Sequence, residues 1–264
     1  MRSRPIGIFD SGFGGLSLMK RLTKILPNEN IIYFGDSANA PYGDKTKKEI
    51  IEKTVSACQF LEKKNIKVLI IACNTACIYA YREVQKKLSI PVIGIITPSY
   101  QKVLQQTKNH KIGVIATKAT TYSGVYKKKI QSIDHKAEVF SVACPLFVPL
   151  IEDGLEDLKL AKKLAKYYLK PLKKKKIDTL LLGCTHYPFM KKIIQDVLGS
   201  NIKVIDPSIA CAREANLFLE RFDLKNPSTK NGSYIFYTSG DPIKFKRIAS
   251  KFLDKKIDKV LKKR

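Results

Sequence analysis

The chain has no tryptophan, three histidines and only 23 acidic residues, against 49 lysines and arginines. Its six cysteines include no CxxC pair, and no histidine stands at ligand spacing from a cysteine pair. Zinc sites use such spacings, so the pattern argues against one. Cys73 and Cys77 could share a helical face, but Cys77 is interpreted as a small buried side chain. We therefore expect no metal.

Long apolar segments are also missing. The longest apolar runs span about six or seven residues, whereas a membrane helix needs about 20. Residues Met1–Pro5 lead straight into a strand-like Ile6–Phe9, with no signal-like segment before it. A length of 264 residues allows one or two domains with a sizeable core. We expect a cytoplasmic protein with reduced cysteines and no membrane partner.

The net charge of +26 raises the possibility of a nucleic-acid partner. Lysine supplies 41 of the 49 basic residues, whereas specific nucleic-acid readers rely on arginine. Most lysines are expected on polar helical faces, as in Lys127–Lys129, Lys173–Lys176 and Lys255–Lys263. We interpret the charge as solvated surface and keep nucleic-acid binding as the weaker alternative. The charge could still attract anionic substrates, although salt screens it beyond about 8–10 Å.

Short apolar runs of strand length alternate with amphipathic stretches of helical length along most of the chain. The expected strands are Ile6–Phe9, Asn30–Phe34, Val68–Ala72, Val92–Ile95, Lys111–Ala116, Ala137–Val142, Thr179–Gly183, Ile202–Ile205 and Ser233–Tyr237. The expected helices include Leu16–Leu26, Lys47–Lys63, Thr75–Leu88, Leu155–Leu169 and Ala210–Phe222. This alternation predicts the α/β class, with mostly parallel sheets flanked by helices.

A local similarity between two distant segments suggests two similar lobes with a cleft between them. X-Pro punctuation at Thr97-Pro98 and at Asp206-Pro207 marks plausible crossing points between the lobes. We therefore expect residues 1–97 and 208–264 to form the first lobe, and residues 98–207 the second. Ligands of such folds bind beyond the carboxyl ends of the strands.

The two similar segments each place a cysteine after an apolar run. Lys67–Thr75 ends in Ala-Cys-Asn-Thr, and Asp178–His186 ends in Gly-Cys-Thr-His, so Cys73 and Cys184 stand in matching positions. A strand-to-helix junction stabilises negative charge and can lower a thiol pKa. Because the context is shared, we interpret both cysteines as functional and expect one to come from each lobe.

Two further loops follow strands and could bind a small ligand. Asp10–Leu16 is a glycine-rich turn before a helix, a ready anion site, but it lacks the spacing of a P-loop or dinucleotide fingerprint. A carboxylate suits it, with Ser11 as a donor. Asp10 could cap the turn or meet an ammonium group. Asp36–Gly43 is either an ordinary turn or a loop that closes over a ligand.

A thiol pair suits the transfer of a proton from one face of a carbon to the other. The α-hydrogen of an amino acid is a weak acid, so its removal needs a base on one face and inversion needs an acid opposite. Donors must also stabilise charge on the carboxylate. A disulfide reductase would bring a CxxC or a flavin motif, and neither is visible.

Five blocks of the sequence, in the same order along the chain, resemble the motif set of bacterial glutamate racemases of the aspartate/glutamate racemase superfamily. They are Asp10-Ser11-Gly12-Phe13-Gly14-Gly15-Leu16, Tyr33-Phe34-Gly35-Asp36, Pro41-Tyr42-Gly43, Ala72-Cys73-Asn74-Thr75-Ala76 and Leu182-Gly183-Cys184-Thr185-His186-Tyr187-Pro188. The similarity extends from Ile6 to about Ser208.

The resemblance implies racemisation of L- and D-glutamate without a cofactor, supplying D-glutamate for peptidoglycan. It implies that Cys73 is the base toward D-glutamate and Cys184 the base toward L-glutamate, with Asp10, His186 and Glu152 assisting. The residues that it implies for substrate binding are Asp10, Ser11, Tyr42, Gly43, Asn74, Thr75, Thr117, Thr185 and His186. Family members are often homodimers, so a homodimer is expected. An aspartate racemase, and a racemase fold without activity, stay open as alternatives.

Overall fold

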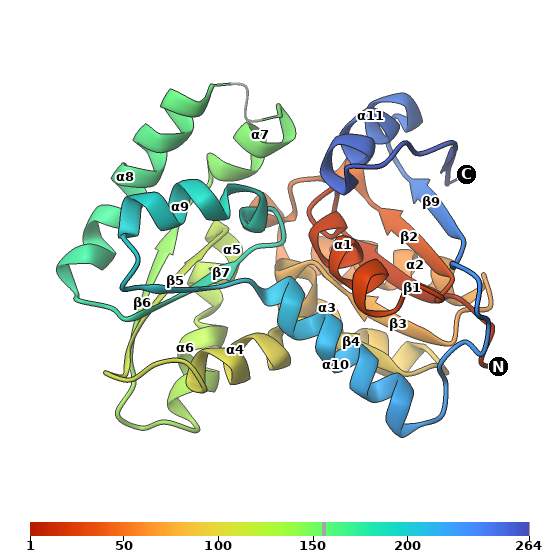
Figure 1. The fold of residues 1–264 in the computed structure, drawn as a ribbon, viewed down its shortest axis with the longest axis horizontal. Helices are drawn as coiled ribbons and strands as arrows, with labels where there is room; N and C mark the ends of the chain where they lie inside the picture. Colours follow the sequence, from red (N-terminus) through yellow and green to blue (C-terminus); the bar gives the residue numbers. More distant parts are fainter. Residues whose placement is uncertain (155–156, 264) are drawn as a thin grey trace.

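The computed structural model describes residues 1–154 and 157–263, which form two parallel β-sheets flanked by helices (Figure 1). The first sheet has the strand order β10-β9-β2-β1-β3-β4, and the second has the order β6-β5-β7-β8. The strands are β1 (Ile6–Asp10), β2 (Ile31–Gly35), β3 (Val68–Ile71), β4 (Val92–Gly94), β5 (Lys111–Ala116), β6 (Glu138–Ala143), β7 (Thr179–Gly183), β8 (Lys203–Ile205), β9 (Tyr234–Thr238) and β10 (Val260–Lys262). Their recorded pairings are all parallel.

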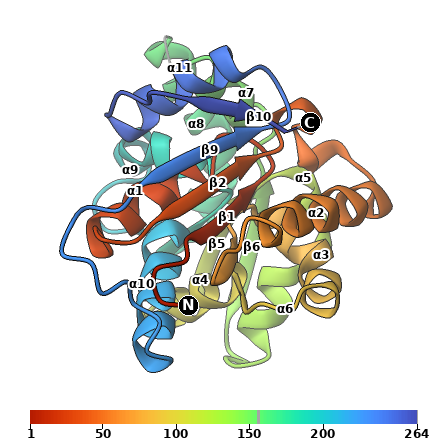
Figure 2. The same ribbon diagram turned by 90° about the vertical axis from the view of Figure 1, so that its right-hand side faces the viewer.

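Helices cover both faces of each sheet, which is why the central strands are buried along their whole length. Figure 2 shows α1 and α10 on one side of the first sheet, with α2 and α3 on the other. The α-helices are α1 (Leu16–Ile25), α2 (Lys47–Glu62), α3 (Asn74–Lys87), α4 (Ile96–Leu104), α5 (Lys118–Ser123), α6 (Val125–Gln131), α7 (Phe147–Glu152), α8 (Leu158–Lys174), α9 (Lys191–Leu198), α10 (Pro207–Arg221) and α11 (Pro242–Leu253). Three short 3-10 turns are η1 (Ser37–Asn39), η2 (Tyr42–Asp44) and η3 (Tyr187–Met190).

The predicted α/β class with parallel sheets is confirmed, and each of the nine expected strands has a counterpart in the structure. The expected helices also have counterparts. The one predicted over Leu155–Leu169 corresponds to α8, although Leu155 lies outside the described residues. Apolar runs therefore located the strands well, because strands covered on both faces need side chains that are apolar throughout.

The interpretation of Lys255–Lys263 as a helical face is wrong. Helix α11 ends at Leu253, and β10 then pairs in parallel with β9 at the edge of the first sheet. The backbone N–H of Lys263 donates to the Thr238 carbonyl at 2.8 Å. A three-residue strand is too short to show an alternating pattern, and here its partner strand determines the conformation.

Two helices, α4 and α10, lie where the chain passes between the sheets. Helix α4 follows β4 of the first sheet, and α10 follows β8 of the second. Thr97-Pro98 lies in the first turn of α4, where proline is tolerated, and Pro207 is the first residue of α10. Helix α4 packs against α6 and β7, α10 packs against α1, and the two helices contact each other (Figure 1). Asp206 caps α10 by accepting a bond from the Ser208 N–H.

Candidate active site

The carboxyl ends of β1, β3 and β7 lead into one narrow cavity. Its volume is about 30 Å³, which is room for about two water molecules. Both sheets therefore contribute to a single enclosed site. The lining residues are Ser11, Ala40, Pro41, Tyr42, Gly43, Cys73, Asn74, Thr75, Thr117, Val148, Glu152, Gly183, Cys184, Thr185 and His186.

Cys73 is the N-cap of α3 and is buried on the side of the first sheet. Its Sγ accepts from the Ala76 N–H at 3.5 Å and lies 3.2 Å from the Ser11 hydroxyl. Burial, and then the nearby Asp10 carboxyl, raise the pKa of Cys73 to about 12 in spite of these donors. The Ala76 N–H at the helix N-terminus lowers this pKa, as expected, but burial outweighs it and the net shift is upward.

Cys184 has different surroundings. It follows β7 and precedes the short 3-10 turn η3, so it lacks the long helix that begins at Cys73. Its Sγ lies 3.8 Å from His186 Nδ1, and His186 Nε2 lies 2.9 Å from Glu152 Oε1. Burial would lower the pKa of His186, but hydrogen bonds to Cys184 and Glu152 prevail and raise it to about 10. The imidazole of His186 therefore lies between the Cys184 sulfur and the Glu152 carboxylate.

Asp10 lies beside the cavity and connects the two halves of the site. Its Oδ1 accepts from the Gly12 N–H at 2.9 Å, as expected for a turn cap. Its Oδ2 accepts from the Thr185 hydroxyl at 3.0 Å, which was not foreseen. Complete burial raises the pKa of this carboxyl, and the proximity of His186 partly offsets that rise.

The remaining predicted residues also lie at the cavity. The hydroxyl of Thr75 is 3.0 Å from that of Thr117, so the α3 N-terminus contacts the α5 N-terminus. Tyr42 lines the cavity but donates its hydroxyl to Asp36 Oδ2 at 2.6 Å. Gly43 packs directly against Thr117, because an added Cβ would lie 2.9 Å from the threonine side chain. Hence every predicted residue lines this cavity or, in the case of Asp10, contacts a residue that does.

Several residues at the site were missed. Val148 and Ala40 line the cavity as small or branched apolar walls, which carry no recognisable pattern in a sequence. Asp36 was noted only as part of a loop, yet it is buried and holds both Tyr42 and Asn39. Tyr126 of α6 bonds to Asn74 across the two sheets, and no signal near it in the sequence points to that contact.

The matching family model is described as Asp/Glu/Hydantoin racemase and covers residues 6–215. The chain belongs to this family. Within it, the chain is 46% identical over 260 residues to glutamate racemase 2 of Caldanaerobacter subterraneus subsp. tengcongensis, covering 98% of this chain and 97% of the relative. It is 42% identical to glutamate racemase of Streptococcus agalactiae serotype III, covering 98% of each chain. The predicted resemblance is confirmed, and the chain is an amino-acid racemase of the glutamate racemase branch.

Solved structures agree with the family assignment. Glutamate racemase from Francisella tularensis in complex with D-glutamate superposes with a TM-score of 0.93 at 40% identity, covering 100% of this chain and 98% of that one. The isoform RacE1 from Bacillus anthracis has a TM-score of 0.94 at 35% identity, covering 100% and 97%. An aspartate racemase from Picrophilus torridus, at 19% identity and a TM-score of 0.61, shares the fold.

A second cavity of about 430 Å³ adjoins the narrow one in this member of the racemase family. The two cavities share Ala40, Pro41, Gly43, Thr117, Val148 and Glu152 in their walls. Lys118 and Lys244 line the outer cavity together with the acidic Asp44, Glu152 and Asp241, so its wall carries both signs of charge. The outer space adjoins the cavity that holds the thiols.

Neither a metal cluster nor a membrane helix is found in the described part of the chain. In residues 1–154 and 157–263, no group of three histidine, cysteine or acidic side chains could hold a metal ion. No helix within the same ranges has the length and apolar character to span a bilayer.

Proposed function

We propose that this chain interconverts L- and D-glutamate without a cofactor, by a two-base mechanism in which Cys73 and Cys184 act on opposite faces of the α-carbon. The observation that carries the mechanism is that two free thiols, one from each sheet, line the same cavity. Donors from both sheets surround them, as an acid–base site for a carboxylate substrate requires.

In the direction from L- to D-glutamate, the Cys184 thiolate removes the α-proton and the Cys73 thiol gives its proton to the other face. The S–H bond formed at one sulfur replaces the one broken at the other, so the enzyme ends with the opposite protonation pattern. Burial and Asp10 keep Cys73 protonated, since they raise its pKa to about 12. The raised pKa of His186 keeps the imidazole beside the Cys184 sulfur protonated, so a positive charge faces this thiol.

Negative charge that develops on the substrate carboxylate needs hydrogen-bond donors. Asn74, Thr75 and Thr185 flank the two cysteines in the cavity wall and can provide them. Donors fixed in a buried site stabilise such charge better than water does, because they need no reorganisation during the reaction.

The narrow cavity of about 30 Å³ is smaller than glutamate and adjoins the outer cavity of about 430 Å³. We infer that the substrate enters from the outer cavity and that the walls shared by the two cavities separate to admit it.

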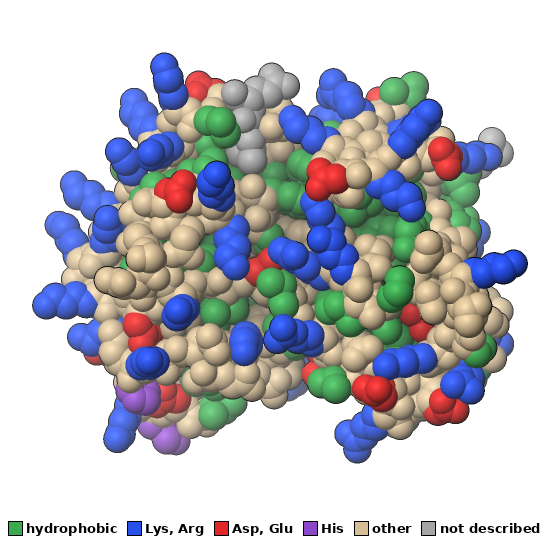
Figure 3. All heavy atoms as spheres, viewed as in Figure 1, with side chains coloured by type: hydrophobic (Ala, Val, Ile, Leu, Met, Phe, Trp, Pro, Cys, Tyr) green, Lys and Arg blue, Asp and Glu red, His purple; other side chains and the backbone are tan. Residues whose placement is uncertain are grey.

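The proposal also covers the pathway, the compartment and the oligomeric state of the enzyme. D-glutamate made here would serve peptidoglycan synthesis, and the enzyme would act as a homodimer in the cytoplasm. The six cysteines are all free and buried, which suits a reducing compartment. The lysines are scattered over the visible face in Figure 3, as expected for solvated surface, so a nucleic-acid partner stays the weaker alternative.

The test is a circular-dichroism time course of the purified protein with D-glutamate and, separately, with L-glutamate. Both signals should decay to zero, and kcat/KM should be equal in the two directions because the equilibrium constant is one. In heavy water, the product should carry deuterium at the α-carbon. Dialysing the enzyme beforehand against a reagent that captures pyridoxal cofactors should leave the rate unchanged, because the proposed mechanism uses no cofactor. Turnover of aspartate but not of glutamate would refute the substrate assignment.

Single substitutions test the thiols. Cys73→Ala and Cys184→Ala should each lower the racemisation rate by at least about 10²-fold, because each removes a proton-transfer group. Cys77→Ala is the matched control, since Cys77 is a buried cysteine of the same helix that does not line the cavity. An active Cys73→Ala or Cys184→Ala variant with a native melting curve would refute the two-base mechanism.

A further inference from the structure

We propose that Tyr126 is a positioning residue for the racemisation: its hydroxyl fixes the amide of Asn74 so that Nδ2 faces the substrate carboxylate. This inference rests on the proposed function of the cavity. Tyr126 belongs to α6, beside the second sheet, whereas Asn74 opens α3, beside the first. The contact therefore spans the two halves of the molecule, next to Cys73.

The geometry leaves the two ends of the Asn74 amide in different situations. The Tyr126 hydroxyl donates to Asn74 Oδ1 at 2.5 Å, and both side chains are 2% exposed. Asn74 Nδ2 is buried and has no hydrogen-bond partner among the described residues, although Asn74 lines the cavity. A buried unpaired donor costs about 1–3 kcal/mol, so its retention beside the thiol points to a partner that arrives with the substrate.

The substrate offers such a partner in its carboxylate. Asn74 directly follows Cys73, the proposed base for D-glutamate, so a donor there lies near the α-carbon and its carboxylate. An amide can turn over and present its oxygen instead, which would repel a carboxylate. The tyrosine hydroxyl favours the observed orientation, because it donates to Oδ1 and leaves Nδ2 for another partner. Burial raises the pKa of Tyr126 well above its ordinary value, so the hydroxyl stays protonated throughout the working pH range.

The same boundary is bridged one residue further along the chain. Thr75, the next residue, bonds to Thr117 and Thr120 of the second half, so the whole α3 N-terminus is held from that side. The effect of Tyr126 on Asn74 must therefore be separated from a purely structural one.

The experiment is a double-mutant cycle with Tyr126→Phe and Asn74→Ala, measured with D-glutamate. Tyr126→Phe removes only the hydroxyl that orients the Asn74 amide. The value of kcat/KM should fall about tenfold, the effect of losing one hydrogen bond to a charged group, here the bond from Asn74 to the substrate carboxylate. The fall should appear in both KM and kcat, because the amide binds the carboxylate and also stabilises the charge that develops on it in the transition state. In the Asn74→Ala background, Tyr126→Phe should change kcat/KM less than about twofold.

Tyr79→Phe is the matched control. Tyr79 also belongs to α3, and its hydroxyl donates across the same boundary to the Ala119 carbonyl at 3.1 Å, away from the cavity. This variant should keep the wild-type kcat/KM. If Asn74→Ala does not turn over, calorimetric binding of D-glutamate replaces kcat/KM in the same cycle.

Additive effects of the two substitutions, or an unchanged Tyr126→Phe variant, would overturn the positioning role and leave the racemase proposal intact. A wild-type protein that does not racemise glutamate would overturn both. Equal losses in Tyr126→Phe and Tyr79→Phe would mean that the hydroxyls only hold the two halves together.

Discussion

At the scale of single residues, the two proposed bases are chemically unequal although their sequence contexts are alike. Cys73 is buried beside the Asp10 carboxyl, and both features disfavour a thiolate. Cys184 is beside His186, which Glu152 holds in place. A positive charge near Cys73 would favour its thiolate, and the ammonium group of a bound amino acid carries one. We infer that binding of D-glutamate itself helps to activate this thiol.

The buried imidazolium makes a prediction about stability. The pKa of His186 is raised from 6.5 to about 10 in the folded protein. Its contribution to the free energy of unfolding should be fully present below about pH 6.5 and should be lost as the pH rises through about 10. Urea unfolding of the wild type and His186→Gln should therefore differ most near pH 6 and least above pH 10. A difference that is independent of pH would show that His186 is neutral in the fold.

At the scale of structural elements, the turn between β1 and α1 packs closely against the Cys-Thr-His segment of the other half. An added Cβ at Gly14 would lie 2.3 Å from Thr185 Oγ1 and 2.5 Å from His186 Nδ1. Glycine is needed there because no other side chain leaves room for the Cys-Thr-His segment. Its neighbour Gly12 is less constrained, since a Cβ there would meet Glu152 Oε1 at an ordinary 3.5 Å.

We expect Gly14→Ala to lower the racemisation rate more than tenfold and to destabilise the fold by about 1–3 kcal/mol, because Thr185 and His186 must move. Gly12→Ala, two residues away in the same turn, should have a much smaller effect on both. Rates by circular dichroism and unfolding free energies by urea titration check this. Equal behaviour of the two variants would contradict the close approach at Gly14.

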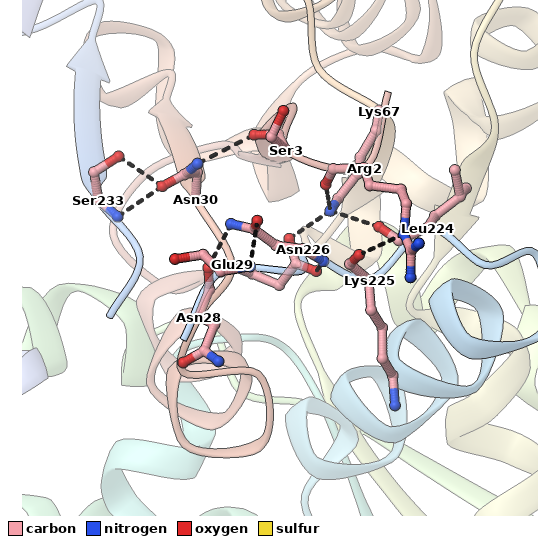
Figure 4. A network of polar contacts seen from close by, with 11 residues as sticks. Arg2, Ser3, Asn28, Glu29, Asn30, Lys67, Leu224, Lys225, Asn226 and Ser233 are labelled. Carbon is pink, nitrogen blue, oxygen red and sulfur yellow. Dashed lines mark hydrogen bonds and ion pairs between the residues drawn. The ribbon is translucent and has the colours of Figure 1, made fainter. Parts of the chain in front are cut away.

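At the scale of the whole molecule, the C-terminal segment must return from α10 to the first sheet. A buried ion pair between Glu29 and Lys67 lies on its route (Figure 4). Lys67 Nζ also donates to the Arg2 carbonyl at 2.6 Å and the Leu224 carbonyl at 2.8 Å. Glu29 Oε1 accepts from the Asn226 N–H at 2.7 Å. One charged pair thus joins four segments that are distant in the chain, at residues 2, 29, 67 and 224–226.

Breaking this pair should be costly, because it leaves a buried charge without a partner. We expect Lys67→Met to lower the free energy of unfolding by about 3–5 kcal/mol, and Glu29→Gln in the same chain to recover part of that loss. Lys63→Met, at an exposed position four residues earlier, is the control and should change stability little. Urea unfolding measures all three. A small loss in Lys67→Met would mean that the ion pair does not hold the returning segment.

The sequence by itself determined the class of fold and most of the site. Runs such as Val68–Ile71 and Thr179–Gly183 are apolar at every position because their strands are covered on both faces, and this signal is local. The two cysteine contexts follow those strands directly. They were therefore recognisable without knowing how the strands pair.

Only the tertiary structure decided the rest, because it depends on contacts between distant segments. The strand β10 exists because β9 offers an edge, and the raised pKa of Cys73 follows from burial beside Asp10. The bond from Tyr126 to Asn74 joins two helices, α6 and α3, that lie beside different sheets. Such contacts produce no local pattern of apolar and polar residues in a sequence, since each depends on which distant segments the fold brings together.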